Sequence, residues 1–106
     1  MEISADIIRG HIDTIILKLL VNEDMYGYLI SKTIHSASGG AYELKEATMY
    51  SSLKRLESDG NITWYWGDET QGGRRKYYKI TEQGRATYQE NKKNWEYAKA
   101  VLDQLL

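Results

Sequence analysis

Two clusters of basic residues are the part of this sequence best suited to binding a charged partner. Lys54 and Arg55 are adjacent, and four more basic residues fall within six positions: Arg74, Arg75, Lys76 and Lys79. Ammonium and guanidinium groups bind phosphate, so such clusters indicate contact with a nucleic-acid backbone. In an arbitrary domain they would more often form a solvated face. The elements that carry them therefore decide between the two interpretations.

No arrangement of residues for catalysis presents itself. His11 and His35 lack the spacing of metal ligands, and we interpret both as structural or surface residues. Cysteine is absent, which excludes thiol catalysis and thiolate metal sites and is compatible with a reducing compartment. The Gly72-Gly73 pair is too short a signal for nucleotide binding. We therefore expect a cytoplasmic protein that is not an enzyme and has no cofactor or metal.

Chain length and charge limit the partners further. The chain has 106 residues, which suits one domain, and a domain of this size often gains stability by oligomerising. Its formal net charge of −1 argues against coating nucleic acid through bulk charge. No segment approaches the roughly 20 apolar residues of a membrane span, and charged residues interrupt the first apolar run, so we expect neither membrane insertion nor a signal peptide.

Hydrophobic periodicity predicts three helices in the first part of the chain, at residues 4–21, 26–37 and 46–58. Ser4 is expected to cap the first of them. Between the second and third helices, residues 42–44 are expected to form a short extended piece that seals the hydrophobic face. A winged helix often has its small first strand there.

The third predicted helix separates apolar from polar residues. Met49, Leu53 and Leu56 follow four- and three-residue steps and should face the core. At roughly 100° per residue the opposite face is small, polar and basic, with Ala47, Ser51, Lys54, Arg55 and Ser58. A helix with this outer face can lie close to DNA in the major groove.

A two-stranded ribbon follows this helix. Residues 62–66 alternate as a strand, residues 74–80 form the return strand, and residues 67–73 form the loop between them. The length of the loop indicates a flexible wing rather than a tight hairpin turn. Trp64 and Trp66 are expected to pack within the wing, and the second basic cluster lies at its tip.

A long final helix is predicted from residue 82 to residue 106, opened by Thr81. Its apolar residues fit heptad a and d sites, and Asn91 is a polar break that we expect to help fix register. Because such a helix reaches beyond a small domain, its apolar stripe needs a partner, most simply a second copy of the chain. The stripe comprises Tyr88, Trp95, Ala98, Leu102 and Leu105.

The predicted fold is therefore mainly α-helical with a small β-wing. We divide it into a winged helix-turn-helix DNA-binding domain at residues 1–81 and a C-terminal dimerisation helix at residues 82–106.

Two runs of the sequence resemble the signature of a known family. The run EATMYSSLKRLESDGNI starts at residue 46 and the run GGRRKYYKITEQG starts at residue 72. Together they are similar to the PadR family of bacterial transcriptional regulators, and the likeness covers nearly the whole chain. The single C-terminal helix resembles the compact, LmrR-like subfamily of multidrug-sensing repressors. Many members have proline where Ser51 and Gly73 stand here, which suggests an altered start to base reading and a looser wing.

The resemblance implies a homodimeric repressor that binds a double-stranded DNA operator. The third helix would enter the major groove, with Thr48 and Ser51 as candidates for reading bases. Tyr50 would contact a phosphate or pack under the wing. Phosphate contacts would come from Lys54, Arg74 and Arg75, and Arg55 and Lys76 are expected to contact the DNA as well.

Trp95 is a core residue or a ligand site. In the compact multidrug sensors, a tryptophan on the last helix stacks on flat aromatic ligands at the dimer axis, and Trp95 occupies the matching place. Ile8 and Ile15 are the expected walls of such a pocket. Lys92 and Lys99, one turn to either side, would disfavour cationic drugs and favour neutral or anionic aromatics.

An alternative function is a winged helix used as a protein-interaction module without direct DNA binding. The sequence pI of about 6.1 supports it weakly, since it leaves no large excess of positive charge.

Overall fold

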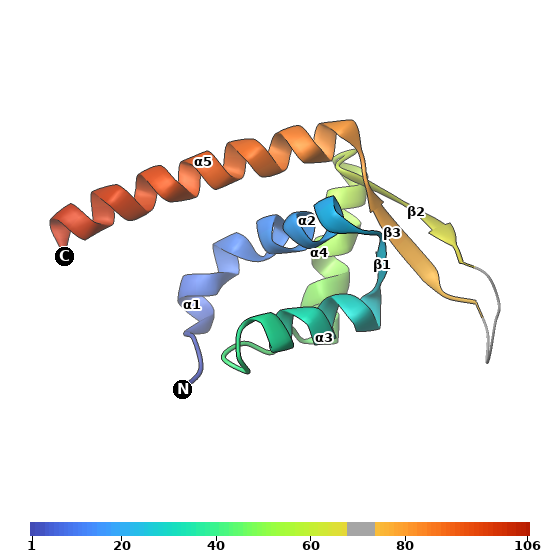
Figure 1. Cartoon of the computed structure of the whole chain (residues 1–106), viewed down its shortest axis with the longest axis horizontal. Coiled ribbons are helices and arrows are strands. Elements are labelled where there is room, and N and C mark those ends of the chain that lie inside the picture. The colour runs from blue at the N-terminus through green and yellow to red at the C-terminus, as the bar shows by residue number, and fades with distance from the viewer. Residues whose placement is uncertain (68–73) are drawn as a thin grey trace.

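The computed structural model of the chain describes residues 1–67 and 74–106 (Figure 1). Residues 68–73, which hold most of the predicted wing loop and the Gly72-Gly73 pair, lie outside the described residues. The elements follow in the order α1 (Ala5–Ile8), η1 (Arg9–His11), α2 (Ile12–Asn22), β1 (Met25–Tyr26), α3 (Gly27–Ala37), α4 (Glu46–Ser58), β2 (Ile62–Trp66), β3 (Lys76–Ile80) and α5 (Glu82–Leu105). This is the predicted mainly helical fold with a small β-wing, and the bounds of α4 and β2 agree with the predicted ones.

The first predicted helix is in fact two helices joined by the 3-10 turn η1, so the prediction of one continuous helix was wrong. The cap was correct: the Ser4 side chain accepts a hydrogen bond from the backbone N–H of Asp6 at 3.2 Å. Gly10 lies within η1, and glycine weakens a helix interior. The break was missed because the apolar repeat continues through it.

The small first strand lies directly before α3 and not at residues 42–44, where it was expected. In β1, Met25 pairs with Tyr78 of β3, and the antiparallel sheet has the order β1-β3-β2. A strand of two residues is too short to show alternation in the sequence. The segment at 42–44 still seals the core, because Leu44 is buried and Tyr42 packs against the core while half-buried.

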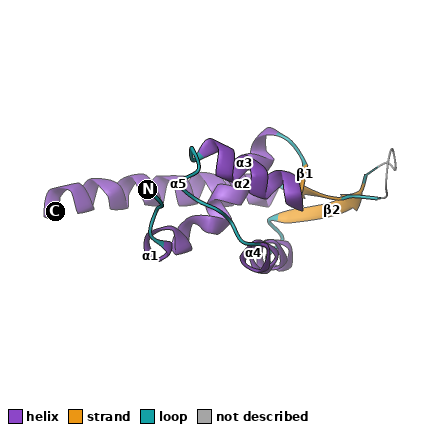
Figure 2. Cartoon of the chain, turned by 90° about the horizontal axis from the view of Figure 1, so that it is seen from below, coloured by secondary structure: helices purple, strands orange, loops and turns teal. Residues whose placement is uncertain are grey.

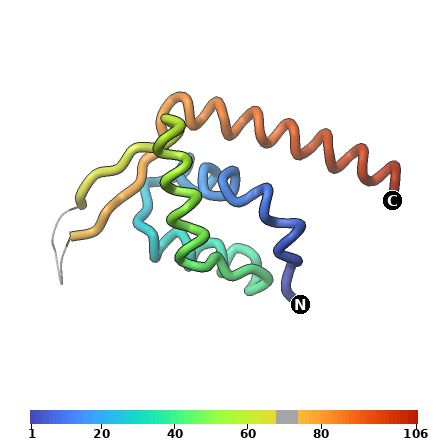
Figure 3. The backbone as a smooth tube through the Cα atoms, turned by 180° about the vertical axis from the view of Figure 1, so that it is seen from behind, coloured from blue at the N-terminus to red at the C-terminus, as the bar shows by residue number. Residues whose placement is uncertain are grey.

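The core lies between α2, the inner faces of α3 and α4, and the sheet (Figure 2). Ile16, Leu17 and Leu20 of α2 are almost completely buried, as are Ile30 of α3 and Leu53 of α4. Burying side chains of this size stabilises the fold by about 1.5–3 kcal/mol each. The core therefore fixes α4 firmly while leaving its other face outward, and Figure 3 shows α4 crossing the near side of the molecule beside the two wing strands.

The start of α5 is anchored to the end of α4 through Asn61. The carbonyl of Asn61 accepts a hydrogen bond from the backbone N–H of Thr81, and its buried side chain accepts one from Thr87 at 2.8 Å. A Cβ added at Gly84 would lie 2.0 Å from the Asn61 carbonyl oxygen, so only glycine allows this close approach. The Thr81 side chain caps the helix as predicted, accepting a hydrogen bond from the backbone N–H of Gly84.

From this anchor α5 runs past α2 and projects beyond the rest of the chain (Figure 1). The molecule measures 52 × 33 × 21 Å, and α5 lies along its longest dimension. Within the described residues, no helix combines the length and apolar character needed to cross a membrane.

Candidate nucleic-acid interface and ligand cavity

The outer face of α4 has the composition predicted for it. Thr48, Ser51 and Lys54 are exposed, whereas Met49 and Leu53 on the opposite face are at most 3% exposed. Because the exposed face carries short side chains, its backbone can come close to a base-pair edge. Sequence periodicity thus sufficed to orient this helix.

Arg55 is held in an ion pair that the sequence did not reveal. Its Nε and Nη2 atoms donate hydrogen bonds to the Asp13 carboxylate of α2 at 2.8 and 2.6 Å, and Ser52 donates to the same carboxylate. Burial raises the pKa of Asp13, but the hydrogen bonds from Arg55 and Ser52 outweigh it and hold the pKa below the usual value. Asp13 is 42 residues from Arg55, so no local spacing could have shown the pair.

Three basic residues of the wing lie over aromatic rings of the three-stranded sheet. The Lys76 ammonium is 4.2 Å from the centre of Trp64, and the Arg75 guanidinium is 4.5 Å from the centre of Tyr26. Arg74 lies over Trp66 at 5.6 Å. Cation–π contacts of this kind stabilise by about 0.5–1 kcal/mol at exposed sites, so the rings hold these cations in place.

The same rings bear out the interpretation of the wing tryptophans as wing packing. Trp64 and Trp66 meet edge to face with their ring centres 5.4 Å apart. Strand β3 begins at Lys76 rather than at residue 74, so Arg74 and Arg75 precede it. Both arginines are exposed.

The Tyr50 side chain extends from α4 toward the start of α3 and the wing. A Cβ added at Gly27 would lie only 2.6 Å from the Tyr50 hydroxyl oxygen, so the phenol covers this glycine. Tyr50 also lines a shallow hollow together with Arg75 and Lys76. The residue remains 44% exposed, so it is partly open to solvent beside this hollow.

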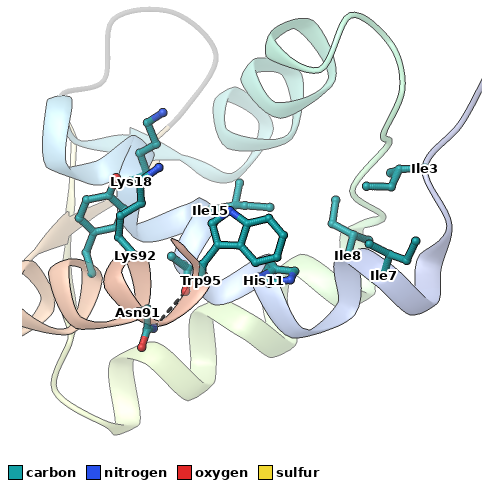
Figure 4. A pocket seen from close by; sticks show the side chains of 11 residues that line it. Ile3, Ile7, Ile8, His11, Ile15, Lys18, Asn91, Lys92 and Trp95 are labelled. Carbon is teal, nitrogen blue, oxygen red and sulfur yellow. Dashed lines mark hydrogen bonds between the residues drawn. The ribbon is translucent and has the colours of Figure 1, made fainter. Parts of the chain in front are cut away.

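A cavity of about 320 Å³ lies between the N-terminal helices and α5, and it brings together all three residues predicted to bind a ligand (Figure 4). Trp95 comes from α5, whereas Ile8 and Ile15 come from α1 and α2. The imidazole of His11 meets the Trp95 indole edge to face, with ring centres 4.8 Å apart. The full lining is Ile3, Ile7, Ile8, His11, Thr14, Ile15, Lys18, Tyr88, Asn91, Lys92 and Trp95.

The sequence interpretation overlooked His11 and Lys18 as cavity residues. The sequence held a signal for both, since positions 8, 11, 15 and 18 are separated by three- and four-residue steps and fall on one helix face. Of the two lysines predicted near Trp95, Lys92 lines the cavity, while Lys99 is not among its lining residues and forms an ion pair with Asp103 at 3.2 Å.

Asn91, which we expected to help fix register between two copies, makes a contact within its own chain. Its side-chain amide donates a hydrogen bond to the Thr14 hydroxyl at 3.0 Å. Thr14 follows Asp13 on α2, so neighbouring residues of one helix bind α5 and α4. Helix α2 thereby connects α5, which forms one wall of the cavity, to α4.

From Trp95 onward, the large apolar side chains of the α5 stripe stay partly or largely exposed in the described chain. Trp95 is 38% exposed, Leu102 46% and Leu105 75%. Ile7 of α1 is also exposed and lines the cavity. Large apolar side chains gathered in this way mark an interaction surface more often than an ordinary solvated face.

Residues 16–90, well over half of the chain, match the transcriptional regulator PadR-like family. The chain belongs to this family. A transcriptional regulator from Clostridium thermocellum shares 47% of its sequence, covers 96% of both chains and superposes with a TM-score of 0.89. A PadR family transcription regulator from Clostridium difficile is 39% identical over 91% of this chain and 98% of that chain, with a TM-score of 0.80. An uncharacterised protein from Lysinibacillus sphaericus is 45% identical over 95% of this chain and 93% of its own.

Membership in the PadR-like family confirms the prediction of a transcriptional regulator that is not an enzyme. It also accounts for the arrangement of α3, α4 and the wing as a winged helix-turn-helix, which PadR regulators use to bind DNA.

Proposed function

We propose that this PadR-like regulator is a homodimeric repressor whose binding to operator DNA responds to an aromatic ligand beside Trp95. The observation that carries the proposal is the continuity between the uncovered apolar stripe of α5 and the cavity at Trp95. A second copy of the chain would cover the stripe and close the cavity in one step. Residues 1–81 would form the DNA-binding unit and residues 82–106 the dimerisation helix, in a protein of the cytoplasm.

In this proposal α4 lies in the major groove and the wing follows the DNA backbone. Thr48 and Ser51 read base edges, since they are short and exposed on the outer face. Lys54, Arg74, Arg75 and Lys76 contact phosphates, and the hydroxyl of Tyr50 supplies a further donor to the backbone. Arg55 uses two of its three guanidinium nitrogens on Asp13, so we assign it chiefly to holding α4 and secondarily to a phosphate.

The ligand would act through the relative angle of the two DNA-binding units. A ligand changes this angle only if it binds one dimer geometry better than another. A ring stacked on Trp95 would push on α5, and the Asn91–Thr14 hydrogen bond would pass the displacement to α2. The adjoining Asp13–Arg55 pair would carry it to α4.

Binding of the regulator to the DNA upstream of its own gene tests the first part of the proposal. Affinity should fall steeply between 50 and 200 mM salt and should exceed the affinity for unrelated DNA. A protein-interaction module would show neither property. An Arg74→Ala/Arg75→Ala variant should bind this DNA more weakly, whereas the affinity of an interaction module for a protein partner need not change.

Analytical ultracentrifugation tests the dimer. The chain should sediment as a dimer, and Leu102→Lys should shift it toward monomer because it places a charge in the apolar stripe. Gln104→Lys, on the same turn but outside the stripe, is the matched control. A native chain that sediments as a monomer at micromolar concentration would refute this part.

A further inference from the structure

We propose that Asp13 limits the affinity of the regulator for DNA by holding the Arg55 guanidinium away from the DNA phosphates. Asp13 lies on α2 and not on the elements assigned to DNA contact, so it would act through Arg55 as a positioning residue. The inference rests on the proposed placement of α4 in the major groove, and it is carried by the geometry of one ion pair.

The Arg55 side chain is open to a phosphate on the outer face of α4. It follows Ser51 by four residues, so both fall on that face. The side chain is 55% exposed, and the neighbouring Lys54 is exposed as well. Arg55 would therefore bind a phosphate as readily as Lys54 does if no other anion occupied its guanidinium.

Asp13 occupies the guanidinium with the geometry that arginine uses for phosphate. Nε and Nη2 of Arg55 donate to the two carboxylate oxygens at 2.8 and 2.6 Å, which is a two-point contact. The almost completely buried Ser52 also donates to this carboxylate and fixes its position. Burial raises the pKa of Asp13, but these hydrogen bonds hold the pKa below its usual value, so the carboxylate is ionised at neutral pH.

A phosphate that approaches Arg55 thus meets a neutral pair in place of a cation. To bind it, the guanidinium would have to leave Asp13, whose side chain is only 29% exposed, and an unpaired carboxylate would remain beside the phosphate. The pair removes one phosphate contact per chain, and this loss does not depend on the DNA sequence. Stability and DNA affinity therefore place opposite demands on Asp13.

Asp13→Asn separates this role from a purely structural one, because the two predict opposite changes in affinity. Affinity is measured by fluorescence anisotropy of labelled duplexes, one from upstream of the regulator's own gene and one unrelated. The variant should bind both roughly three- to ten-fold more tightly than the native chain at about 100 mM salt, although it is less stable. The slope of log affinity against log salt should steepen by about 1 for each Arg55 that gains a phosphate.

Three further variants locate the gain. Asp13→Ser is a second neutral side chain that should show the same gain, and it guards against a folding defect peculiar to asparagine. Ser52→Ala removes a hydrogen bond to the carboxylate but keeps its charge, so affinity and slope should stay native. In Asp13→Asn/Arg55→Gln neither charge remains, and affinity should return to within about two-fold of the native value.

Asp59 supplies the matched control for net charge. It lies four residues after Arg55 and acts on it through its charge, but its carboxylate forms no ion pair within residues 1–67 and 74–106. Asp59→Asn should therefore raise affinity by less than about two-fold.

Equal or weaker DNA binding by Asp13→Asn would overturn the inference. A gain that survives the loss of Arg55, or an equal gain in Ser52→Ala or Asp59→Asn, would overturn it as well. In each of these cases the native chain still binds DNA in a salt-dependent way. A native chain without such binding would instead refute the proposed DNA-binding function itself.

Discussion

Asp13 of α2 and Arg55 of α4 are joined by two hydrogen bonds, and the residue after Asp13 is bonded to α5. Helix α2 therefore contacts α4 with one side chain and α5 with the next. Such adjacency lets a movement of α5 reach α4 through a single turn of a buried helix. The pair is also a source of stability that depends on pH.

Asp13→Asn should lower the free energy of unfolding by about 1 kcal/mol at pH 7, because it replaces a charge-assisted pair that is only partly buried. The folded-state pKa of Asp13 is depressed, so its contribution is complete above the ordinary pKa near 4 and is lost as pH falls through the folded value. Urea unfolding at pH 7 and pH 3 should show the variant and the native chain converging in acid. Asp6→Asn, which disrupts an exposed pair with Arg9, should change little at either pH.

Gly84→Ala should destabilise the chain by about 1–3 kcal/mol, since the new methyl group would collide with the Asn61 carbonyl. Thermal unfolding followed by circular dichroism measures the loss. Gly10→Ala is the matched control, because a Cβ at that position meets no atom within 4 Å. Equal melting temperatures for the two variants would show that α5 does not dock closely on Asn61.

Trp95→Ala should leave operator affinity within about two-fold and abolish the change that a flat aromatic probe, 2-naphthoate, causes in it. The ring lies on α5, far along the chain from the basic face of α4, and forms the centre of the cavity. Fluorescence anisotropy of labelled operator DNA gives both quantities. Tyr97→Ala, on the same helix and 75% exposed, should keep the ligand response, and a response that survives in Trp95→Ala would place the ligand elsewhere.

Lys54→Ala and Lys76→Ala should each lower operator affinity and reduce the slope of log affinity against log salt by about 1. The loss should be similar for specific and unrelated DNA, because phosphate contacts do not read sequence. Lys99→Ala removes a lysine that is already paired with Asp103 on α5, so its slope should match the native one. Thr48→Ala, by contrast, should alter the preferred sequence more than the slope.

Thr14→Val should weaken the ligand response of DNA binding without abolishing ligand binding. The substitution keeps the shape of the side chain and removes the acceptor for Asn91. Calorimetry with 2-naphthoate should give a near-native affinity, while operator anisotropy should give a smaller ligand effect. A native-sized effect would show that the displacement of α5 reaches α4 by another route.

The elements that carry repeated apolar spacing could be predicted from the sequence. The bounds, the buried side and the outer face of α4 were all predicted correctly, because burying Met49, Leu53 and Leu56 allows only one orientation of the helix. The long α5 and its Thr81 cap were equally local features. Trp95, Ile8 and Ile15 could be grouped as one site through the family resemblance, and the cavity confirms that they meet.

The features that were missed depend on contacts between distant residues or on very short elements. The two-residue strand β1 exists because β3 pairs with it, and residues 42–44 seal the core without any strand partner. Asp13 and Arg55 find one another only after α2 and α4 pack. His11 and Lys18 are different, because they share the three- and four-residue spacing of Ile8 and Ile15, and this local signal was overlooked.

The one-sided anchoring of α5 would, in the proposed dimer, make the order of its last turns depend on protein concentration. From residue 92 onward its side chains are exposed, apart from the half-buried Val101, so the last part of the helix receives little tertiary support from its own chain. Isolated helical segments shorter than about 12–15 residues are marginal in water. Newly made chains below the association threshold would therefore carry a fraying end that proteases can attack, and pairing would protect it. The lifetime of such a chain would therefore rise with its concentration, because the dimer protects the end that the monomer exposes.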